Sequence, residues 1–509
     1  MSPTFGWSLD VTGTRRRAVA LSSSFVFSIA VGTVGPAGVM AAEYNPATDV
    51  NSMPSTTDYV GADSWWDAGY TGKGITVALI DTGVAPVDGL RTPGKIIYGP
   101  DLSLESQAPE LSNLDTYGHG TFMAGLIAGH DDALTAPYSQ APASVYRGMA
   151  PDAKILSVKV GTADGGTDVS QVIAAIDWVV QHKNDNGMNV RILNLSYGTN
   201  STQGYVVDPL SFAVEQAWKA GIVVVAAAGN SGYQKGANAP GLADPAYNPM
   251  VIAVGGSDSV GTPVVYDDDV ASFSANSNAC NLACRNPDFI APGAHIQGLR
   301  VPNSYIDLNY PGGVLSARYL RGSGTSESAA IASGAAALIL DKHPTFTPDQ
   351  VKAFLNQGAA HLAGYTARQQ GNGELALAAL LTSGPSKAGQ FFTPATGIGS
   401  LEIARGSDHL TMDGVVLTGE RDIFGKPFAS ADMAALEAAG NSWSGGVWNG
   451  SVWTGNSWSG NSWSGNSWSG NSWSGNSWSG NSWSGNSWSG NSWSGNSWSG
   501  NSWSSAGWN

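Results

Sequence analysis

Three short segments of the chain carry side chains that together could perform nucleophilic catalysis. Asp81, His119 and Ser326 lie in the segments IDTG, GHGT and GSGTS, each beside glycines that let another backbone approach closely. A carboxylate, an imidazole and a hydroxyl in this chain order form one of the known arrangements of the Ser-His-Asp triad. In a triad the imidazole takes the proton of the hydroxyl, which attacks a carbonyl carbon. The three segments therefore predict acyl transfer through a serine nucleophile.

Each of the three residues also has a purely structural interpretation. An aspartate after a buried strand often caps a helix or forms a turn, and a histidine between glycines is often a loop residue. A serine before an alanine-rich helix is, taken alone, usually an N-cap. The catalytic interpretation depends on the three occurring together and in this order, with Asp115 shortly before His119.

The elements that must position these side chains alternate between strands and helices. Runs rich in β-branched residues predict buried strands at residues 74–80, 154–160, 190–195, 221–227 and 250–254. Helical patterns separate them at residues 121–128, 169–182, 209–220 and 326–341. This alternation predicts an α/β fold with a doubly wound, mostly parallel sheet flanked by helices. Ligands of such sheets bind beyond the carboxyl ends of the strands, where Asp81 and Asn230 both lie.

Three further motifs accompany the triad segments. They are LNLSYG at residues 193–198, AAAGNSG at 226–232 and NPDFIAPG at 286–293. With these six ordered blocks the chain resembles the subtilase (subtilisin-like) family of serine peptidases over residues 59–381, in an actinobacterial type with C-terminal Trp-rich repeats.

The resemblance implies hydrolysis of peptide bonds through an acyl-enzyme. Ser326 would be the nucleophile, His119 the base, and Asp81 the group that orients His119. Asn230 and the Ser326 backbone N–H would bind the oxyanion. The residues implied to line the substrate site are Leu195, Ser196, Tyr197, Gly198, Ala226, Ala227, Ala228 and Gly229.

Substrate and cofactor predictions are coarser. The substrates are peptides or proteins, and small neutral lining residues favour an apolar or unselective P1, with Asp244 as an alternative that would favour cations. No cofactor is required for the chemistry and no metal site is assigned. Structural calcium, known in the family, stays open, with Asp131-Asp132 and the run 267–269 as candidates whose alternative is a solvated loop.

Some positions depart from the family pattern. Glu327 stands where the family usually has Met, and a carboxylate there suits the positive end of a helix. Ala330 replaces a Pro and Phe122 replaces a common second His. Residues 43–58 leave no room for a folded propeptide, so we expect either that the chain folds unaided or that a partner or the C-terminal region restrains its activity.

Composition and sequence organisation bound the remaining possibilities. The 509 residues carry a net charge of −15, which argues against a nucleic-acid partner. Residues 1–42, with Arg15, Arg16 and Arg17 before an apolar stretch, predict an export signal, or alternatively an uncleaved anchor. The expected product is a secreted or cell-surface monomer.

Cys280 and Cys284 predict a local disulfide, with free thiols or a partial metal site as alternatives.

Domain boundaries follow from the composition. They are a short N-terminal segment at 43–58, a peptidase domain at 59–383, a linker with a small accessory region at 384–440, and a tail at 441–509. The tail repeats NSWSG, and its tryptophans recur every five residues from Trp443 to Trp508. An odd period cannot keep every indole on one face of a simple strand.

We therefore expect a flexible tail with exposed indoles, rather than an ordered coil. Exposed indoles could stack on sugars or lie at a membrane or cell-wall interface. The alternative for the tail is a passive spacer. The alternative for the whole chain is an inactive subtilase scaffold that binds a surface or carbohydrate through these repeats.

Overall fold

The computed structural model describes residues 44–108, 110–233, 241–277, 285–384, 388–407, 409–412 and 415–453. The predicted export signal, the cysteine pair Cys280 and Cys284, and the repeat units after residue 453 lie outside these described residues.

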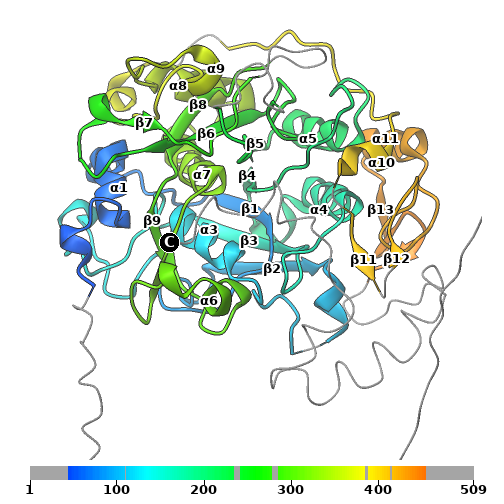
Figure 1. The fold of residues 1–509 in the computed structure, drawn as a ribbon, viewed down its shortest axis with the longest axis horizontal. Coiled ribbons are helices and arrows are strands. Elements are labelled where there is room, and N and C mark those ends of the chain that lie inside the picture. The colour runs from blue at the N-terminus through cyan, green and yellow to red at the C-terminus, as the bar shows by residue number, and fades with distance from the viewer. Residues whose placement is uncertain are drawn as a thin grey trace, which may run out of the picture. The chain divides into compact units, whose positions relative to one another are not determined.

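An eight-stranded sheet forms the centre of the fold, in the order β2-β3-β1-β4-β5-β6-β7, with β8 pairing with β6 (Figure 1). Its strands are β1 (Thr76–Asp81), β2 (Ile96–Asp101), β3 (Lys154–Lys159), β4 (Val190–Leu195), β5 (Val223–Ala227), β6 (Ile252–Asp258), β7 (Asp269–Val270) and β8 (Phe289–Pro292). Every pairing is parallel except β6 with β7. The predicted doubly wound sheet is therefore confirmed, with each predicted strand found at its place in the sequence.

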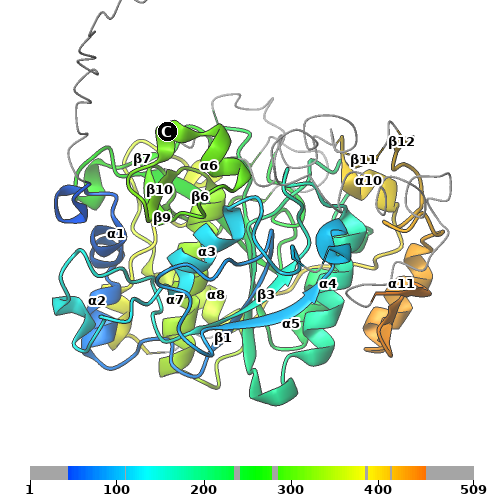
Figure 2. The ribbon, with the colours of Figure 1, turned by 90° about the horizontal axis from the view of Figure 1, so that it is seen from below.

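Helices cover both faces of this sheet (Figure 2). On one face α3 (His119–Ala128) packs against α7 (Thr325–Lys342), and on the other α4 (Val169–His182) packs against α5 (Pro209–Lys219). Asp168 begins α4 with a capping box, which explains why the predicted start is correct. Helices α3 and α7 are buried over nearly their whole length, as helices in the interior of a large domain must be.

The remaining elements surround this framework. The helices are α1 (Met53–Val60), α2 (Ala62–Asp67), α6 (Tyr305–Asn309), α8 (Pro348–Gly358), α9 (Ala367–Gln370), α10 (Leu401–Arg405) and α11 (Ser430–Ala438). The strands are β9 (Ile296–Leu299), β10 (Tyr319–Gly322), β11 (Thr411–Met412), β12 (Val415–Val416), β13 (Trp443–Ser444), β14 (Val447–Trp448) and β15 (Ser451–Val452). Within the described ranges, none of the helices has the length and apolar character needed to cross a membrane.

The start of the tail differs from its prediction. Residues 441–453 form an antiparallel three-stranded sheet, β13-β14-β15, and the side chains of Trp443, Trp448 and Trp453 are only 8%, 0% and 6% exposed. Both connections are two-residue turns with positive φ, the geometry that Gly-Gly and Asn-Gly pairs favour. The expectation of exposed indoles is therefore wrong for these three repeat units.

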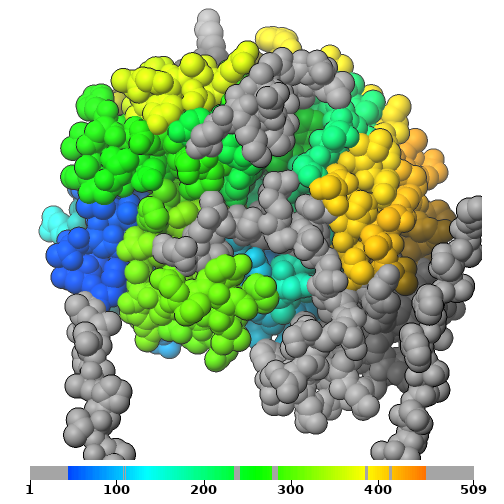
Figure 3. All heavy atoms as spheres, in the orientation of Figure 1, coloured from blue at the N-terminus to red at the C-terminus, as the bar shows by residue number. Residues whose placement is uncertain are grey.

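Two of these indoles attach the small sheet to the peptidase core. Trp443 donates its indole N–H to the carbonyl of Ala174 at 2.8 Å, and Trp448 donates to Asp177 Oδ2 at 2.9 Å, both on α4. The yellow and orange segment lies directly against the green elements of the core in the space-filling view (Figure 3).

Candidate active site

Asp81 and His119 come together where β1 ends and α3 begins. His119 Nδ1 lies 2.9 Å from Asp81 Oδ1 and 3.1 Å from Oδ2, and both side chains are buried. The close approach depends on Gly120, because a Cβ there would lie 2.1 Å from the carbonyl oxygen of Gly83. The predicted need for glycine beside the triad residues is confirmed at this position.

A second carboxylate, Asp115, braces the loop that carries His119. It accepts hydrogen bonds from the Gly118 N–H and the Thr121 N–H, both at 2.7 Å, and from the Thr82 hydroxyl at 2.8 Å. Thr82 in turn donates its backbone N–H to Asp81 Oδ1 at 2.7 Å. The histidine loop and the end of β1 are thus fixed relative to each other through one carboxylate.

A buried lysine that sequence reasoning missed lies beneath this arrangement. Lys159, at the end of β3, pairs with Glu105 at 2.8 Å and donates to the carbonyls of Thr82 and Leu114. The positive charge of its ammonium group lowers the pKa of Asp81, against the effect of burial. A lysine at the buried end of strand β3 was the signal available in the sequence, but its partner lies far away along the chain.

Burial sets the protonation of the pair. Burial lowers the pKa of His119, so its imidazole is neutral at neutral pH and able to accept a proton. Burial also raises the pKa of Asp81, an effect that the hydrogen bonds from Thr82 and the charge of Lys159 oppose.

Ser326 stands in the first turn of α7, the helix that packs against α3. Its hydroxyl donates to the carbonyl of Ser196 at 3.3 Å, and the Ser196 hydroxyl donates to the Ser326 carbonyl at 3.0 Å. These two bonds bring the predicted substrate-lining segment 195–198 against the predicted nucleophile.

Asn230 is held beside the same helix terminus. Its side-chain carbonyl accepts hydrogen bonds from the Thr325 N–H at 2.9 Å and from the Thr325 hydroxyl at 3.1 Å. The Thr325 hydroxyl also accepts the Gly229 N–H at 3.1 Å. Because Thr325 binds the side-chain oxygen of Asn230, the amino group of the same amide is the end that can donate a hydrogen bond to a substrate. Thr325, one residue before Ser326, is an orienting residue that the sequence analysis did not single out.

The other predicted lining residues occupy the ends of β4 and β5. Ala226 and Ala227 end β5. In the loop that follows, the backbone of Ala228 is hydrogen-bonded to the backbone of residues 243 and 254. A Cβ on Gly198 would lie 2.7 Å from Ala243 Cβ, so the two predicted segments and the chain at 243–244 are close neighbours.

Asp244 is buried in this region. Its pKa is raised well above the ordinary value by burial and by the neighbouring Asp208. Because Asp244 is only 1% exposed and its charged form is disfavoured there, the P1 preference stays a prediction that cleavage assays must test.

Glu327 corrects one prediction from the sequence. A carboxylate was expected to be comfortable there, but the side chain is completely buried, and burial together with the charge of Asp81 raises its pKa to about 8. Neither carboxyl oxygen is hydrogen-bonded to any other residue in the described part of the chain.

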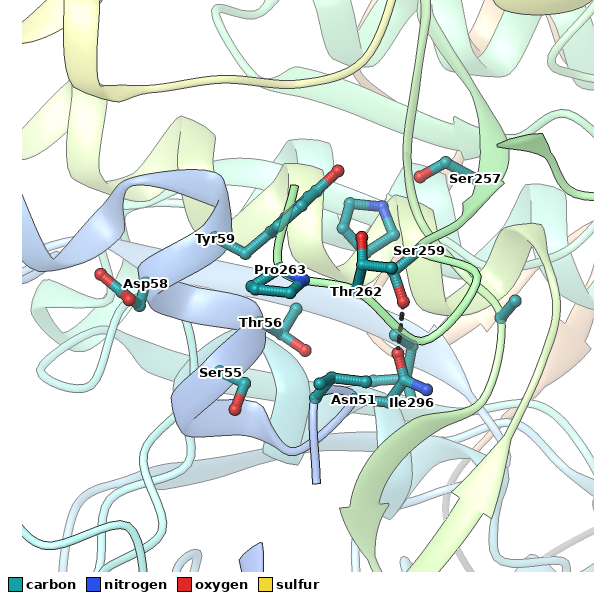
Figure 4. A pocket seen from close by; sticks show the side chains of 13 residues that line it. Asn51, Ser55, Thr56, Asp58, Tyr59, Ser257, Ser259, Thr262, Pro263 and Ile296 are labelled. Atoms are coloured by element: carbon teal, nitrogen blue, oxygen red, sulfur yellow. Dashed lines mark hydrogen bonds between the residues drawn. The ribbon is translucent and has the colours of Figure 1, made fainter. Parts of the chain in front are cut away.

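A separate cavity of about 150 Å³ lies between α1 and the end of β6 (Figure 4). Asn51 and Ser259 close one side of it through a 2.9 Å hydrogen bond, and Tyr59 and Ser257 line it. None of the predicted site residues lines this cavity.

The match to known sequences agrees with this geometry. The profile described as the Subtilase family matches residues 72–373, which include Asp81, His119, Asn230 and Ser326. The chain belongs to the subtilase family. It is a family of serine peptidases, and the resemblance to this family stated from the motifs is confirmed, whereas the actinobacterial type with C-terminal repeats stays a prediction.

Relatives of this subtilase carry the names of proteases. The chain is 38% identical over 291 residues to Serine protease AprX of Bacillus subtilis (strain 168), covering 57% of this chain and 62% of the relative. It is 32% identical over 311 residues to Subtilisin DY of Bacillus licheniformis, covering 61% of this chain and 93% of the relative. The chain thus spans less than two thirds of the length of AprX.

The acidic residues considered for calcium have other partners in this subtilase. Asp131 pairs with Arg318 at 2.6 Å, Asp268 accepts from the Tyr59 hydroxyl, and Asp269 accepts from the Tyr365 hydroxyl at 2.8 Å. Among the described residues no group of three or more His, Cys, Asp or Glu side chains is arranged to hold a metal ion.

Proposed function

We propose that this protein is a serine endopeptidase that cleaves proteins or peptides through Asp81, His119 and Ser326. The observation that carries the proposal is the buried hydrogen bond of 2.9 Å between His119 and Asp81 at the edge of the sheet where α7 presents Ser326. The protease names of its relatives support the same reaction class.

The mechanism follows from the placement of these groups. Neutral His119 takes the proton of the Ser326 hydroxyl as that oxygen attacks the peptide carbonyl, and later delivers it to the leaving amine. Asp81 keeps the Nδ1 proton in place, so that Nε2 is the basic nitrogen, and stabilises the imidazolium that forms. The water that completes the reaction attacks the acyl-enzyme with His119 again as base.

The developing oxyanion lies at the N-terminus of α7. The Asn230 amino group and the Ser326 backbone N–H are the proposed donors, and the positive end of the helix dipole adds to their effect. Loss of one such donor lowers kcat by about 10²–10³, as in a subtilisin. Asn230→Ala should show a loss of this size with little change in KM.

Labelling with a fluorophosphonate tests the proposal directly. The folded protein should become labelled at Ser326, and Ser326→Ala should not. Ser328→Ala is a matched control, because it removes a buried hydroxyl two residues further along α7 that donates to the Ala291 carbonyl. A folded wild-type protein that takes no label would contradict the peptidase function and favour a binding scaffold.

We further propose that the protein is exported and that the repeat units retain it at the cell surface. The support is the sequence of residues 1–42 and the tryptophan repeats that continue to Trp508. Mass spectrometry of the mature N-terminus tests export. Cell fractionation of the full chain against a chain ending at residue 453 tests retention, and equal release of both would contradict it.

A further inference from the structure

Glu327 is a carboxyl group inside the active site for which the mechanism above has no use. It follows Ser326 directly in the first turn of α7, is 0% exposed, and has no hydrogen bond from either oxygen to any other described residue. A buried carboxylate without donors is strongly disfavoured, whereas a buried neutral acid is tolerated far better.

The surroundings of Glu327 supply no cation. The titratable groups that neighbouring elements bring to this end of α7 are Asp81 from β1 and, hydrogen-bonded to it, His119 from α3. The charge of Asp81 acts on Glu327 in the same direction as burial does. Strands β5 and β8 contribute no titratable side chain.

The other charged groups on elements packed against α7 lie elsewhere. Arg191 of β4 binds the carbonyls of Pro344 and Phe346, past the far end of α7, and Asp258 of β6 accepts from the Val260 N–H. Helix α2 contacts the last turn of α7 through Trp65, which packs against Lys342. Helix α8 contacts the residue after α7 through Phe354, which packs against His343. Charge compensation for an ionised Glu327 is therefore missing from all of these elements in the described part of the chain.

We propose that Glu327 is a neutral carboxylic acid in the working enzyme and that loss of its proton sets the alkaline limit of catalysis at Ser326. This inference rests on the serine-peptidase function proposed above. The family residue at this position, Met, is also uncharged, so protonated Glu327 preserves the electrostatics of the site.

Ionisation of Glu327 would act against the transition state. It would place a negative charge beside the helix terminus where the oxyanion must form, and this oxyanion is bound only by neutral donors. An ionised Glu327 would add little stabilisation to the imidazolium of His119, because Asp81 already contacts that ring at 2.9 Å. The added charge therefore acts mainly against the oxyanion.

The experiment measures kcat/KM for a peptide substrate, and the rate of fluorophosphonate labelling, from pH 6 to 10. Three proteins are compared with the wild type: Glu327→Gln, Glu327→Met, and Glu437→Gln as a matched control. Glu437 is another buried glutamate with a raised pKa, located on α11 and away from the triad. Circular dichroism at each pH establishes that each protein is folded.

The wild type and Glu437→Gln should lose about tenfold in kcat/KM for each pH unit above about 8, since only the neutral fraction is active. Glu327→Gln should keep its activity to pH 10 within about twofold. If Glu327→Gln does not fold, the same result is expected of Glu327→Met.

An alkaline limb that persists in a folded Glu327 variant, or a wild-type profile without one, overturns the inference while leaving the peptidase function intact. Absence of label at every pH in all folded proteins overturns the peptidase function itself. The two failures are thus distinguishable.

Discussion

Replacing Trp448 by Ala should loosen α11 and the small sheet β13-β14-β15 from α4, while Arg405 still pairs with Asp168. Trp448 is 0% exposed and packs against Phe428 and Trp453, with ring centroids 5.9 and 6.1 Å apart. An aromatic side chain of this size buries about 150–250 Å², which at about 25 cal/mol per Å² corresponds to roughly 4–6 kcal/mol. Measured Trp→Ala substitutions in cores cost about 3–5 kcal/mol.

The hydrogen bond to Asp177 adds to this loss. Without the indole N–H, the buried Asp177 carboxyl loses a donor at 2.9 Å, and an unsatisfied buried group costs about 1–3 kcal/mol. Because relaxation and water entry recover part of the sum, we expect a net destabilisation of about 4 kcal/mol at the interface between α4 and β14.

Hydrogen exchange is the suitable assay, because this region can open without global unfolding. In a Ser326→Ala background, which prevents self-cleavage, amides of α11 and β14 should exchange about a thousandfold faster in Trp448→Ala, since each 1.4 kcal/mol is a factor of ten. Amides of β1 and β4 should keep their protection.

Val452→Ala is the matched control for this prediction. Val452 belongs to the same small sheet but is 41% exposed, so its truncation should change exchange by less than about threefold. Equal exchange rates in Trp448→Ala and Val452→Ala would refute the claim that the buried indole holds the region in place.

Three further predictions concern packing, pH and specificity. Gly120→Ala should abolish activity and lower the melting temperature, because the new Cβ would overlap the Gly83 carbonyl oxygen. Gly204→Ala is the control: a Cβ at Gly204 would have no neighbouring atom within 4 Å, so both measurements should be nearly unchanged. Burial raises the pKa of Asp177 to about 7 in the folded protein, so the stability it supplies is complete below about pH 4 and is lost as pH rises through 7. Asp177→Asn should flatten that decline in denaturation curves recorded from pH 4 to 9, and an unchanged slope would contradict this assignment. Peptides with Phe or Leu at P1 should be cleaved with higher kcat/KM than peptides with Arg at P1, because Asp244 is buried and burial and Asp208 both disfavour its charged form. A preference for Arg would contradict this prediction.

The sequence predicted the framework closely because local signals and global fold agree there. Asp168 and Gln171 form the capping box that starts α4, and the apolar run of β1 ends at the carboxylate that the site needs. Parallel strands bring their carboxyl ends to one edge, so the sequence alone could assign Asp81 and Asn230 to the same edge of the sheet.

Features that depend on side-chain packing between distant segments could not be predicted. The ion pair of Lys159 with Glu105 joins β3 to a short 3-10 helix (Leu104–Gln107) 54 residues earlier, and Thr325 orients Asn230 across 95 residues. The burial of Glu327 is a further example, because a glutamate in the first turn of a helix is ordinarily solvated. Here α7 packs against α3 and against strands β4, β5, β6 and β8, so its first turn is buried inside the domain.

The tryptophan repeat shows why a valid rule led to a wrong expectation. Residues an odd number apart lie on opposite faces of one strand, but a two-residue turn reverses the chain between Trp443 and Trp448. Across such a turn, residues i and i+5 are directly opposed and share a face, which is the observed pairing of these two indoles. The next turn places Trp448 opposite Ser451, and Trp453, two residues further on, returns to the same face. A five-residue period is therefore compatible with a one-sided tryptophan surface wherever Gly-Gly or Asn-Gly turns divide it, and the helix α4 is what that surface covers.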